Sequence, residues 1–115
     1  MHHELSKHEK KIARMLIDKG VDAEFRSALE ESSEILSAWK NGDMDNRAGY
    51  HKLFKKIMEY DKRTANRYDG LTGSRYLLTV AGIYIDGQIT AEDIKDFSEQ
   101  TRAILNELLQ FSKRR

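Results

Sequence analysis

The sequence predicts an all-α protein, and three observations support that fold class. The 115 residues contain no Pro, and 34% of them are charged, which suits helices with charged surfaces better than a sheet, whose turns usually contain Pro. Apolar residues recur at three- and four-residue intervals along every long segment, as on one face of a helix. Gly20, Gly42, Gly70 and Gly87 interrupt this periodicity, as glycines at helix ends do. We therefore predict a helical bundle of four main helices plus a shorter, looser N-terminal helix.

Two helices are predicted before Gly42. Residues 4–19 carry only a thin apolar stripe, so we expect the N-terminal helix formed there to be the least stable one. The next helix starts near Asp22 and keeps a nearly unbroken three-four spacing through Phe25, Ala28, Leu29, Ser32, Ile35, Leu36 and Trp39. This is the clearest helical pattern in the chain, and we expect Trp39 to lie in the core.

The third and fourth predicted helices differ in how their apolar residues are distributed. Residues 45–68 place their apolar side chains within one arc by the 3.6-residue period, and most of their Lys and Arg side chains on the opposite side. Residues 74–85 are apolar almost all the way round, which indicates burial on several sides. We expect this fourth helix to be the central element of the bundle.

The stretch IYIDGQITAEDI, residues 83–94, allows three interpretations. The Asp86-Gly87 dipeptide between alternating apolar residues is a strong signal for a β-hairpin. If Gly87 were instead the glycine of a calcium-binding loop, loop positions one and three would be Gly82 and Tyr84, which offer no carboxylate ligand. The charged, three-four periodic sequence that follows favours the third interpretation, a joint between two helices.

Thr90 is the predicted start of the fifth helix. It can cap a helix whose third position is Asp93, in a variant of the capping box with Asp in place of Glu. Ile89 and Ile94 have the spacing of a hydrophobic staple across that cap. We therefore predict a tight turn at residues 86–89 and a helix from Thr90 onward.

Length and composition limit the class of protein. The chain fits one domain over residues 1–115, in which we expect residues 1–8 and 112–115 to fray. No apolar run approaches the ~20 residues of a membrane span, and the first residues lack the apolar core of a secretion signal. The absence of Cys fits a reducing compartment. We expect a cytoplasmic protein that does not enter a membrane.

The chain carries no pattern typical of a catalytic or metal site. Without Cys it has no thiolate ligand and no cysteine nucleophile. His3 and His8 are five residues apart, whereas two zinc ligands on one helical face need a spacing of four. Ala48 stands three residues before His51, where a di-iron bundle needs Glu. We expect no enzymatic activity, no metal and no cofactor; whether His2 and His3 belong to the natural chain stays open.

Asp61 is a polar residue at an apolar position. By the helical period it lies on the apolar arc of residues 45–68, near Ile57 and Tyr68. A buried carboxylate needs a partner, and Arg75, at the start of the fourth predicted helix, is the candidate. We predict a buried ion pair between Asp61 and Arg75, with a structural role favoured over a functional one.

Two opposed blocks of charge underlie the net charge of +1: −5 over residues 22–46 and +5 over residues 47–75. The basic surface of the third predicted helix consists of Lys52, Lys55, Lys56, Lys62, Arg63 and Arg67. Its composition resembles that of a phosphate-binding surface, but Glu59 interrupts it and no aromatic residue interleaves to stack on bases. A solvated face is therefore favoured. Whether the acidic block meets the basic surface within one chain or across a dimer stays open.

These patterns favour a non-catalytic protein. We expect a small helical interaction or regulatory module that acts through a helix face and has a protein partner, with self-association into a homo-oligomer as one form of it. The alternative is a nucleic-acid-associated protein that uses the basic surface, and an enzyme ranks third.

Overall fold

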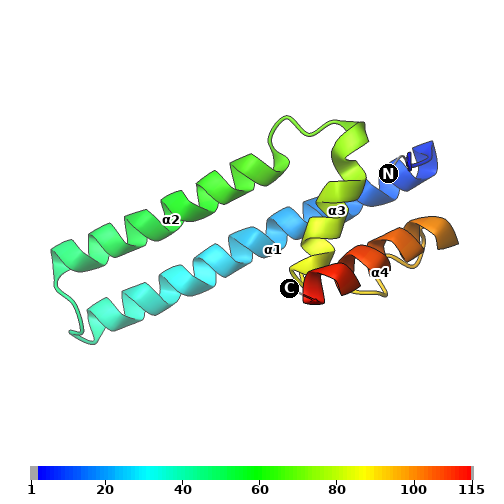
Figure 1. Ribbon diagram of the computed structural model, residues 1–115. Helices are drawn as coiled ribbons and strands as arrows, with labels where there is room; N and C mark the ends of the chain where they lie inside the picture. Colours follow the sequence, from blue (N-terminus) through cyan, green and yellow to red (C-terminus); the bar gives the residue numbers. More distant parts are fainter. Residues whose placement is uncertain (1–2, 115) are drawn as a thin grey trace. The chain divides into compact units, whose positions relative to one another are not determined.

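The structure, a computed structural model, describes residues 3–114. Its elements are four α-helices and one 3₁₀ turn (Figure 1), in the order α1 Lys7–Lys40, α2 Asn46–Tyr68, η1 Gly73–Arg75, α3 Tyr76–Ile85 and α4 Glu99–Lys113. No strand occurs within these residues, so the predicted all-α fold class is confirmed. None of the four helices combines the length and the apolar character that crossing a membrane requires. His2, whose origin stays open, lies outside the described residues.

The predicted number of helices is wrong, because α1 is one continuous helix of 34 residues. We expected an N-terminal helix over residues 4–19 and a second helix from Asp22, with Gly20 as the break. A glycine ends a helix where the backbone turns into the left-handed region, and Gly42, Gly70 and Gly87 do so with φ of 84°, 67° and 78°. Gly20 has no positive φ, and it is a buried residue in the middle of α1. In a helix Gly is about 1 kcal/mol less favourable than Ala, and packing at this buried position offsets that cost.

The chain divides into two compact units. Residues 21–69 form what we call the hairpin unit. Residues 1–20 together with 70–115 form what we call the terminal unit. Helix α1 contributes residues to both units, because the division falls after Gly20, inside the helix.

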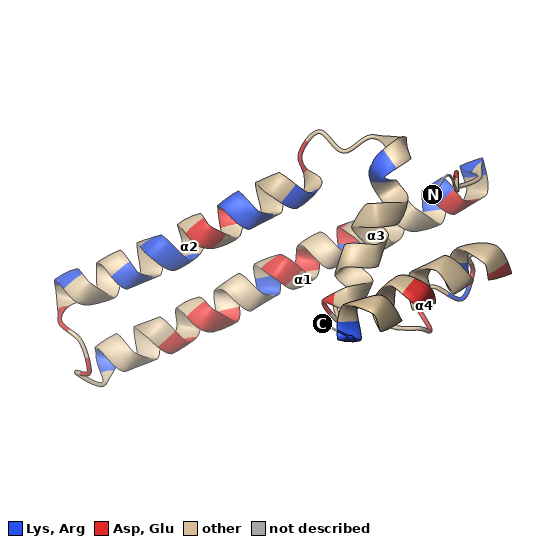
Figure 2. Cartoon of the chain, viewed as in Figure 1, with Lys and Arg blue, Asp and Glu red and all other residues tan. Residues whose placement is uncertain are grey.

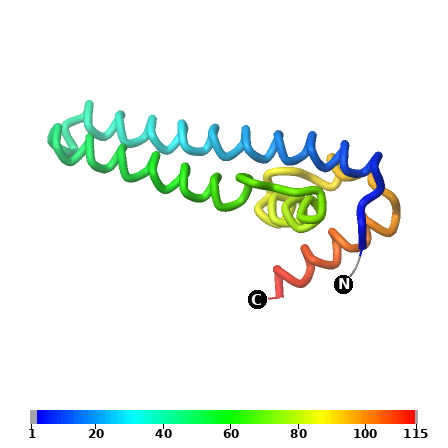
Figure 3. The backbone as a smooth tube through the Cα atoms, turned by 90° about the horizontal axis from the view of Figure 1, so that it is seen from above, coloured from blue at the N-terminus to red at the C-terminus, as the bar shows by residue number. Residues whose placement is uncertain are grey.

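The hairpin unit consists of the C-terminal part of α1 and the antiparallel helix α2, which run side by side (Figure 3). Asp45 caps α2, since its carboxylate accepts a hydrogen bond from the Ala48 N–H at 2.7 Å. Ala28, Ile35 and Tyr60 are buried in this unit. With only two helices, the hairpin has a narrow core and leaves much of each helix exposed.

Trp39 occupies the closed end of the hairpin and is not the core residue that we expected, because it is 38% exposed. The absence of a side chain at Gly49 explains its position: a Cβ atom there would lie 3.3 Å from Trp39 Cδ1. The indole Nε1–H donates a hydrogen bond to Asn46 Oδ1 at 2.7 Å. The Trp39 ring is thus seated over the first turn of α2.

The terminal unit contains the better packed core. Val80 and Ile83 of α3 and Leu105 of α4 are fully buried, and five of the ten residues of α3 are buried in all. Helix α3 packs against α4, and the Tyr84 hydroxyl donates a hydrogen bond to Asn106 Oδ1 at 2.7 Å. The predicted burial of residues 74–85 on several sides therefore agrees with the structure, although Leu78 is 70% exposed.

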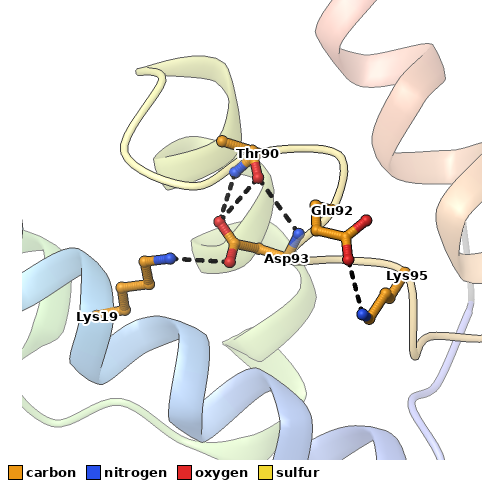
Figure 4. Close-up of polar contacts among 5 residues, drawn as sticks. All are labelled: Lys19, Thr90, Glu92, Asp93 and Lys95. Atoms are coloured by element: carbon orange, nitrogen blue, oxygen red, sulfur yellow. Dashed lines mark hydrogen bonds and ion pairs between the residues drawn. The ribbon is translucent and has the colours of Figure 1, made fainter.

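The capping geometry predicted at Thr90 forms (Figure 4). The Thr90 N–H donates to Asp93 Oδ2 at 2.7 Å, and the Asp93 N–H donates to Thr90 Oγ1 at 3.4 Å. Ile89 and Ile94, the two residues of the staple, are each only 2% exposed. The hairpin and calcium-loop interpretations are not what the structure shows, because α3 runs to Ile85 and a tight turn follows.

The helix predicted from Thr90 nevertheless begins later, at Glu99. Residues 91–96 form consecutive turns, and Ser98 caps α4 by accepting a hydrogen bond from the Thr101 N–H at 3.2 Å. A helix continued from Thr90 would require the Ser98 N–H to bind the carbonyl of Ile94. It donates instead to Glu9 Oε2 of α1 at 3.0 Å, so a contact with a distant residue ends the turns and sets the start of α4.

Candidate interaction surface

One side of the hairpin unit is an apolar surface. Eight large side chains on this side are each 38–68% exposed: Phe25, Leu29, Leu36 and Trp39 from α1, and Tyr50, Phe54, Ile57 and Met58 from α2. We call them the apolar face. Seven of them recur at intervals of three, four or seven residues, which keeps them on one side of each helix, as in a coiled coil. Met58 widens this apolar stripe on α2.

Two hollows lie along the apolar face. One has a volume of about 240 Å³ and is lined by Ile35, Leu36, Trp39, Asn46, Gly49, Tyr50 and Leu53. The other has a volume of about 250 Å³ and is lined by Phe25, Ala28, Leu29, Ile57, Tyr60 and Asp61. Both are smaller than the ~300–1,000 Å³ of typical small-molecule sites, and they are almost entirely apolar in character. Hollows of this kind suit side chains of another helix better than a cofactor.

The opposite side of the hairpin is charged, and we call it the charged face. Along the hairpin, α1 carries mainly acidic residues and α2 mainly basic ones (Figure 2). Lys56 Nζ lies 3.9 Å from Glu31 Oε1 and 3.8 Å from Glu59 Oε2. A hollow of about 200 Å³ between the helices is lined by Glu31, Glu34, Ile35, Ala38, Lys52 and Lys56.

Glu24 is the most buried acidic residue of the hairpin, with a side chain that is 4% exposed. Arg63 Nη1 lies 3.8 Å from Glu24 Oε2, and Arg67 Nη1 lies 3.7 Å from Glu24 Oε1. The Arg63 guanidinium also stacks over the Tyr60 ring at 4.6 Å from its centroid. A hydrogen bond with Glu31, burial and the charge of Glu31 raise the pKa of the Tyr60 phenol above its ordinary value. The ion pairs of the charged face thus connect α1 to α2.

The six basic residues predicted as one surface fall into two groups. Lys56, Arg63 and Arg67 form ion pairs with acidic residues of α1 on the charged face, and Lys52 lines the hollow beside them. Lys55 and Lys62 are exposed and lie outside that group. The acidic block therefore meets the basic surface within one chain.

The buried ion pair predicted between Asp61 and Arg75 is not buried in the structure. Asp61 and Arg75 are both exposed, and Asp61 lines a hollow of the apolar face. Asp61 belongs to the hairpin unit and Arg75 to the terminal unit. A pairing between these two side chains stays a prediction, and neither residue is buried in the structure.

Sequence reasoning did not identify Glu24 and Glu31 as the partners of the basic surface. A signal was present, because the two residues are seven apart and therefore lie on the same side of α1. The apolar face was also misjudged: its spacing was correctly taken as helical, but Trp39 was assigned to the core and the exposure of the other residues was not anticipated. Periodicity shows which residues share a face and not whether another element covers it.

A second cluster of polar side chains joins the beginning of α1 to the beginning of α4 in the terminal unit. Glu9, 7% exposed, accepts hydrogen bonds from the backbone N–H groups of Ser98 and Ser6 at 3.0 and 3.3 Å. Thr101, fully buried, lies 2.8 Å from His3 Nε2 through its hydroxyl. Burial acts to raise the pKa of Glu9, but hydrogen bonds from Thr101, Ser98 and Ser6 outweigh it, and the pKa is lowered from its ordinary value of 4.5.

No set of three or more His, Asp or Glu side chains between residues 3 and 114 is arranged to hold a metal ion. Comparison with known proteins gives no relative: no protein-family model, curated protein or solved structure matches this chain.

Proposed function

We propose that this protein is a non-catalytic interaction module whose hairpin unit binds a helical partner through the apolar face. The observation that carries the proposal is the exposure of eight large apolar side chains on one side of two helices. Helices bury such a stripe against another layer of structure. Exposed apolar patches larger than the usual few hundred Å² mark interaction sites in soluble proteins.

The composition of the apolar face supports this proposal. Four of its residues, Phe25, Trp39, Tyr50 and Phe54, are aromatic, and aromatic side chains dominate the residues that contribute most to binding at protein interfaces. The two hollows between α1 and α2 provide sites for side chains that repeat every three or four residues on an amphipathic helix. The expected partner is therefore a helix, or a pair of helices, with an apolar stripe.

The ion pairs of the charged face favour this function over nucleic-acid binding. Lys56, Arg63 and Arg67 already lie within 4 Å of acidic residues of their own chain. To bind a phosphate group, each of them would have to give up or share this ion pair. The alternative makes its own prediction. Binding of mixed-sequence duplex DNA would weaken steeply between about 50 and 200 mM salt, whereas we expect only weak binding at the lower concentration.

Site-specific photo-crosslinking in cells tests the proposal. A photoreactive amino acid replaces Leu29 or Phe54, which are 68% and 56% exposed on the apolar face. The matched control replaces Leu78, which is 70% exposed on α3 of the terminal unit. We expect covalent adducts of defined mass at Leu29 and Phe54 and none at Leu78. Absence of adducts at both face positions, or the same adducts at all three positions, would overturn the proposal.

A further inference from the structure

We propose that the partner of the apolar face is a second copy of this chain. In the dimer, α1 of each hairpin lies against α2 of the other copy, and the closed ends of the two hairpins lie at the same end. This inference rests on the proposed function and names its partner. It is carried by the area of the apolar face and by the charges along its two edges.

The area of the apolar face is that of a stable dimer. A standard interface buries about 800 Å² per partner, of which roughly 60%, or about 500 Å², is apolar. An aromatic side chain can bury about 150–250 Å². The exposed fractions of Phe25, Trp39, Tyr50 and Phe54, between 38% and 68%, therefore correspond to about 300–500 Å² on that basis. Leu29, Leu36, Ile57 and Met58 add to this area, so one hairpin supplies its share of the interface.

Two symmetric arrangements can bring two hairpins together through this face. With the two-fold axis perpendicular to the helices, α1 lies against α1 and α2 against α2, and the closed ends point in opposite directions. With the axis parallel to the helices, α1 of each copy lies against α2 of the other, and the closed ends lie together. Both are closed, self-complementary interfaces, so the charges at the edges decide between them.

The edge of the apolar face differs in charge between the two helices. On α2, Lys55 follows Phe54 of the apolar face, and Lys62 follows Asp61, which lines one of its hollows. Both lysines lie on the side of α2 turned away from α1. Both side chains are exposed, and neither forms an ion pair within the described part of its own chain. On α1 the corresponding edge carries Arg26 and Glu30, which form an exposed ion pair at 2.9 Å.

These edges favour the arrangement with the axis parallel to the helices. The perpendicular axis would place the Lys55 and Lys62 edge against the same edge of the second copy, which is repulsive. With the parallel axis, residues keep their height along the helices. Glu31 is level with Lys56 across the antiparallel hairpin, so Glu30 comes level with Ile57 of the second copy and Arg26 with its Asp61. Lys55 and Lys62 then face the Arg26–Glu30 pair, an edge without net charge, so this arrangement avoids the repulsion between two lysine edges.

The oligomeric state of the purified full-length chain is the first test. Sedimentation equilibrium is expected to show a dimer at micromolar concentration, and a monomer throughout the accessible range would overturn the inference. Leu29→Lys and Phe54→Lys are each expected to raise the dimer dissociation constant at least about tenfold. Leu78→Lys, which alters an equally exposed Leu outside the face, should leave it unchanged. A dimer that all three variants preserve would place the interface elsewhere and overturn the inference.

The second test concerns the arrangement of the helices. Glu30→Lys is expected to weaken the dimer, and Lys55→Glu combined with Lys62→Glu in the same chain should restore it. The absence of Cys makes Asp43→Cys a unique labelling site in the hairpin loop. Spin labels there should be about 10–20 Å apart with the closed ends together, and about 35 Å apart with them at opposite ends. The longer distance, or no restoration, would overturn the proposed arrangement.

The two proposals fail in different ways. A monomeric chain that still forms adducts at Leu29 and Phe54 with another protein would refute the second copy as partner and leave the apolar face as a binding surface. A monomeric chain in which single Cys residues at these positions react slowly would show that the chain's own terminal unit covers the face. That result would overturn both proposals.

Discussion

Lys19 Nζ lies 2.8 Å from Asp93 Oδ1 and so joins α1 to the turns that precede α4 (Figure 4). The Asp93 side chain is 19% exposed. It also accepts hydrogen bonds from the N–H and the hydroxyl of Thr90 at 2.7 and 3.1 Å. Hydrogen bonding to Lys19 and to the Thr90 backbone outweighs partial burial and lowers the pKa of Asp93 below its ordinary 3.8. One carboxylate therefore stabilises both a turn and a contact between distant segments.

Replacing Asp93 by Ala should lower the free energy of unfolding by about 1–2 kcal/mol, because the Thr90 N–H and Lys19 lose their shared acceptor. Urea unfolding followed by circular dichroism measures the change. Glu92→Ala is the matched control: its ion pair with Lys95 is exposed, with 76% and 60% of the side chains accessible, and should contribute less than about 0.5 kcal/mol. Equal losses in the two variants would contradict a special role for Asp93.

Ser98→Ala should cost about 1 kcal/mol, the usual effect of removing a helix N-cap. Ser98 Oγ accepts the Thr101 N–H at the start of α4, where α-helical structure begins. Thr90→Ala should cost less, because the Thr90 backbone N–H still binds Asp93 and the Thr90 Oγ1 contact with the Asp93 N–H is long, at 3.4 Å. Amide hydrogen exchange at Thr101 gives a local measurement. A larger loss for Thr90→Ala would indicate that α4 starts earlier than in the structure.

Glu9 should make the stability of the protein depend on acid pH. Its pKa in the folded chain is lowered from the ordinary 4.5, so the folded state favours the carboxylate. The contribution to stability is fully present above pH 4.5 and is lost as the pH falls through the folded pKa. Unfolding measured from pH 7 to pH 3 should therefore show a smaller acid loss in Glu9→Gln than in the wild type. Asp93 acts in the same direction, so part of the loss remains.

The matched control for Glu9 is Glu4→Gln, at an exposed position of the same segment. We expect this variant to keep the acid dependence of the wild type. An unchanged pH profile in Glu9→Gln would show that the hydrogen bond from the Ser98 N–H does not depend on the charge of Glu9.

Removing the two guanidinium groups beside Glu24 should destabilise the hairpin unit. In Arg63→Gln combined with Arg67→Gln, a carboxylate whose side chain is 4% exposed loses two cations within 4 Å. We expect a loss of about 1–3 kcal/mol, between the values for exposed and buried ion pairs. Lys7→Gln combined with Lys11→Gln removes the same charge from exposed positions of α1 outside the hairpin unit and should change the free energy of folding by less than about 0.5 kcal/mol. Similar losses in both double variants would mean that the basic residues act only through net charge.

The sequence alone determined the fold class and those helix boundaries that depend on neighbouring residues. Asp45 was recognised as the start of the third predicted helix, and it caps α2 through the Ala48 N–H. Gly42, Gly70 and Gly87 were recognised as chain turns, and all three have positive φ. The reciprocal hydrogen bonds of Thr90 and Asp93 were also predicted and are present. In each case the decisive atoms lie within a few residues, so the local sequence contains the information.

Only the tertiary structure decided the features that depend on residues far apart in the chain. Gly20 stays helical in the middle of α1, at a position that is buried in the folded chain. Helix α4 begins at Glu99 because Glu9, 89 residues before Ser98, takes the N–H that a longer helix would need. Glu24 and Arg63 meet because α1 and α2 are antiparallel. Periodicity places residues on a face, but which face another element covers, and which distant group competes for a backbone N–H, are decided by packing.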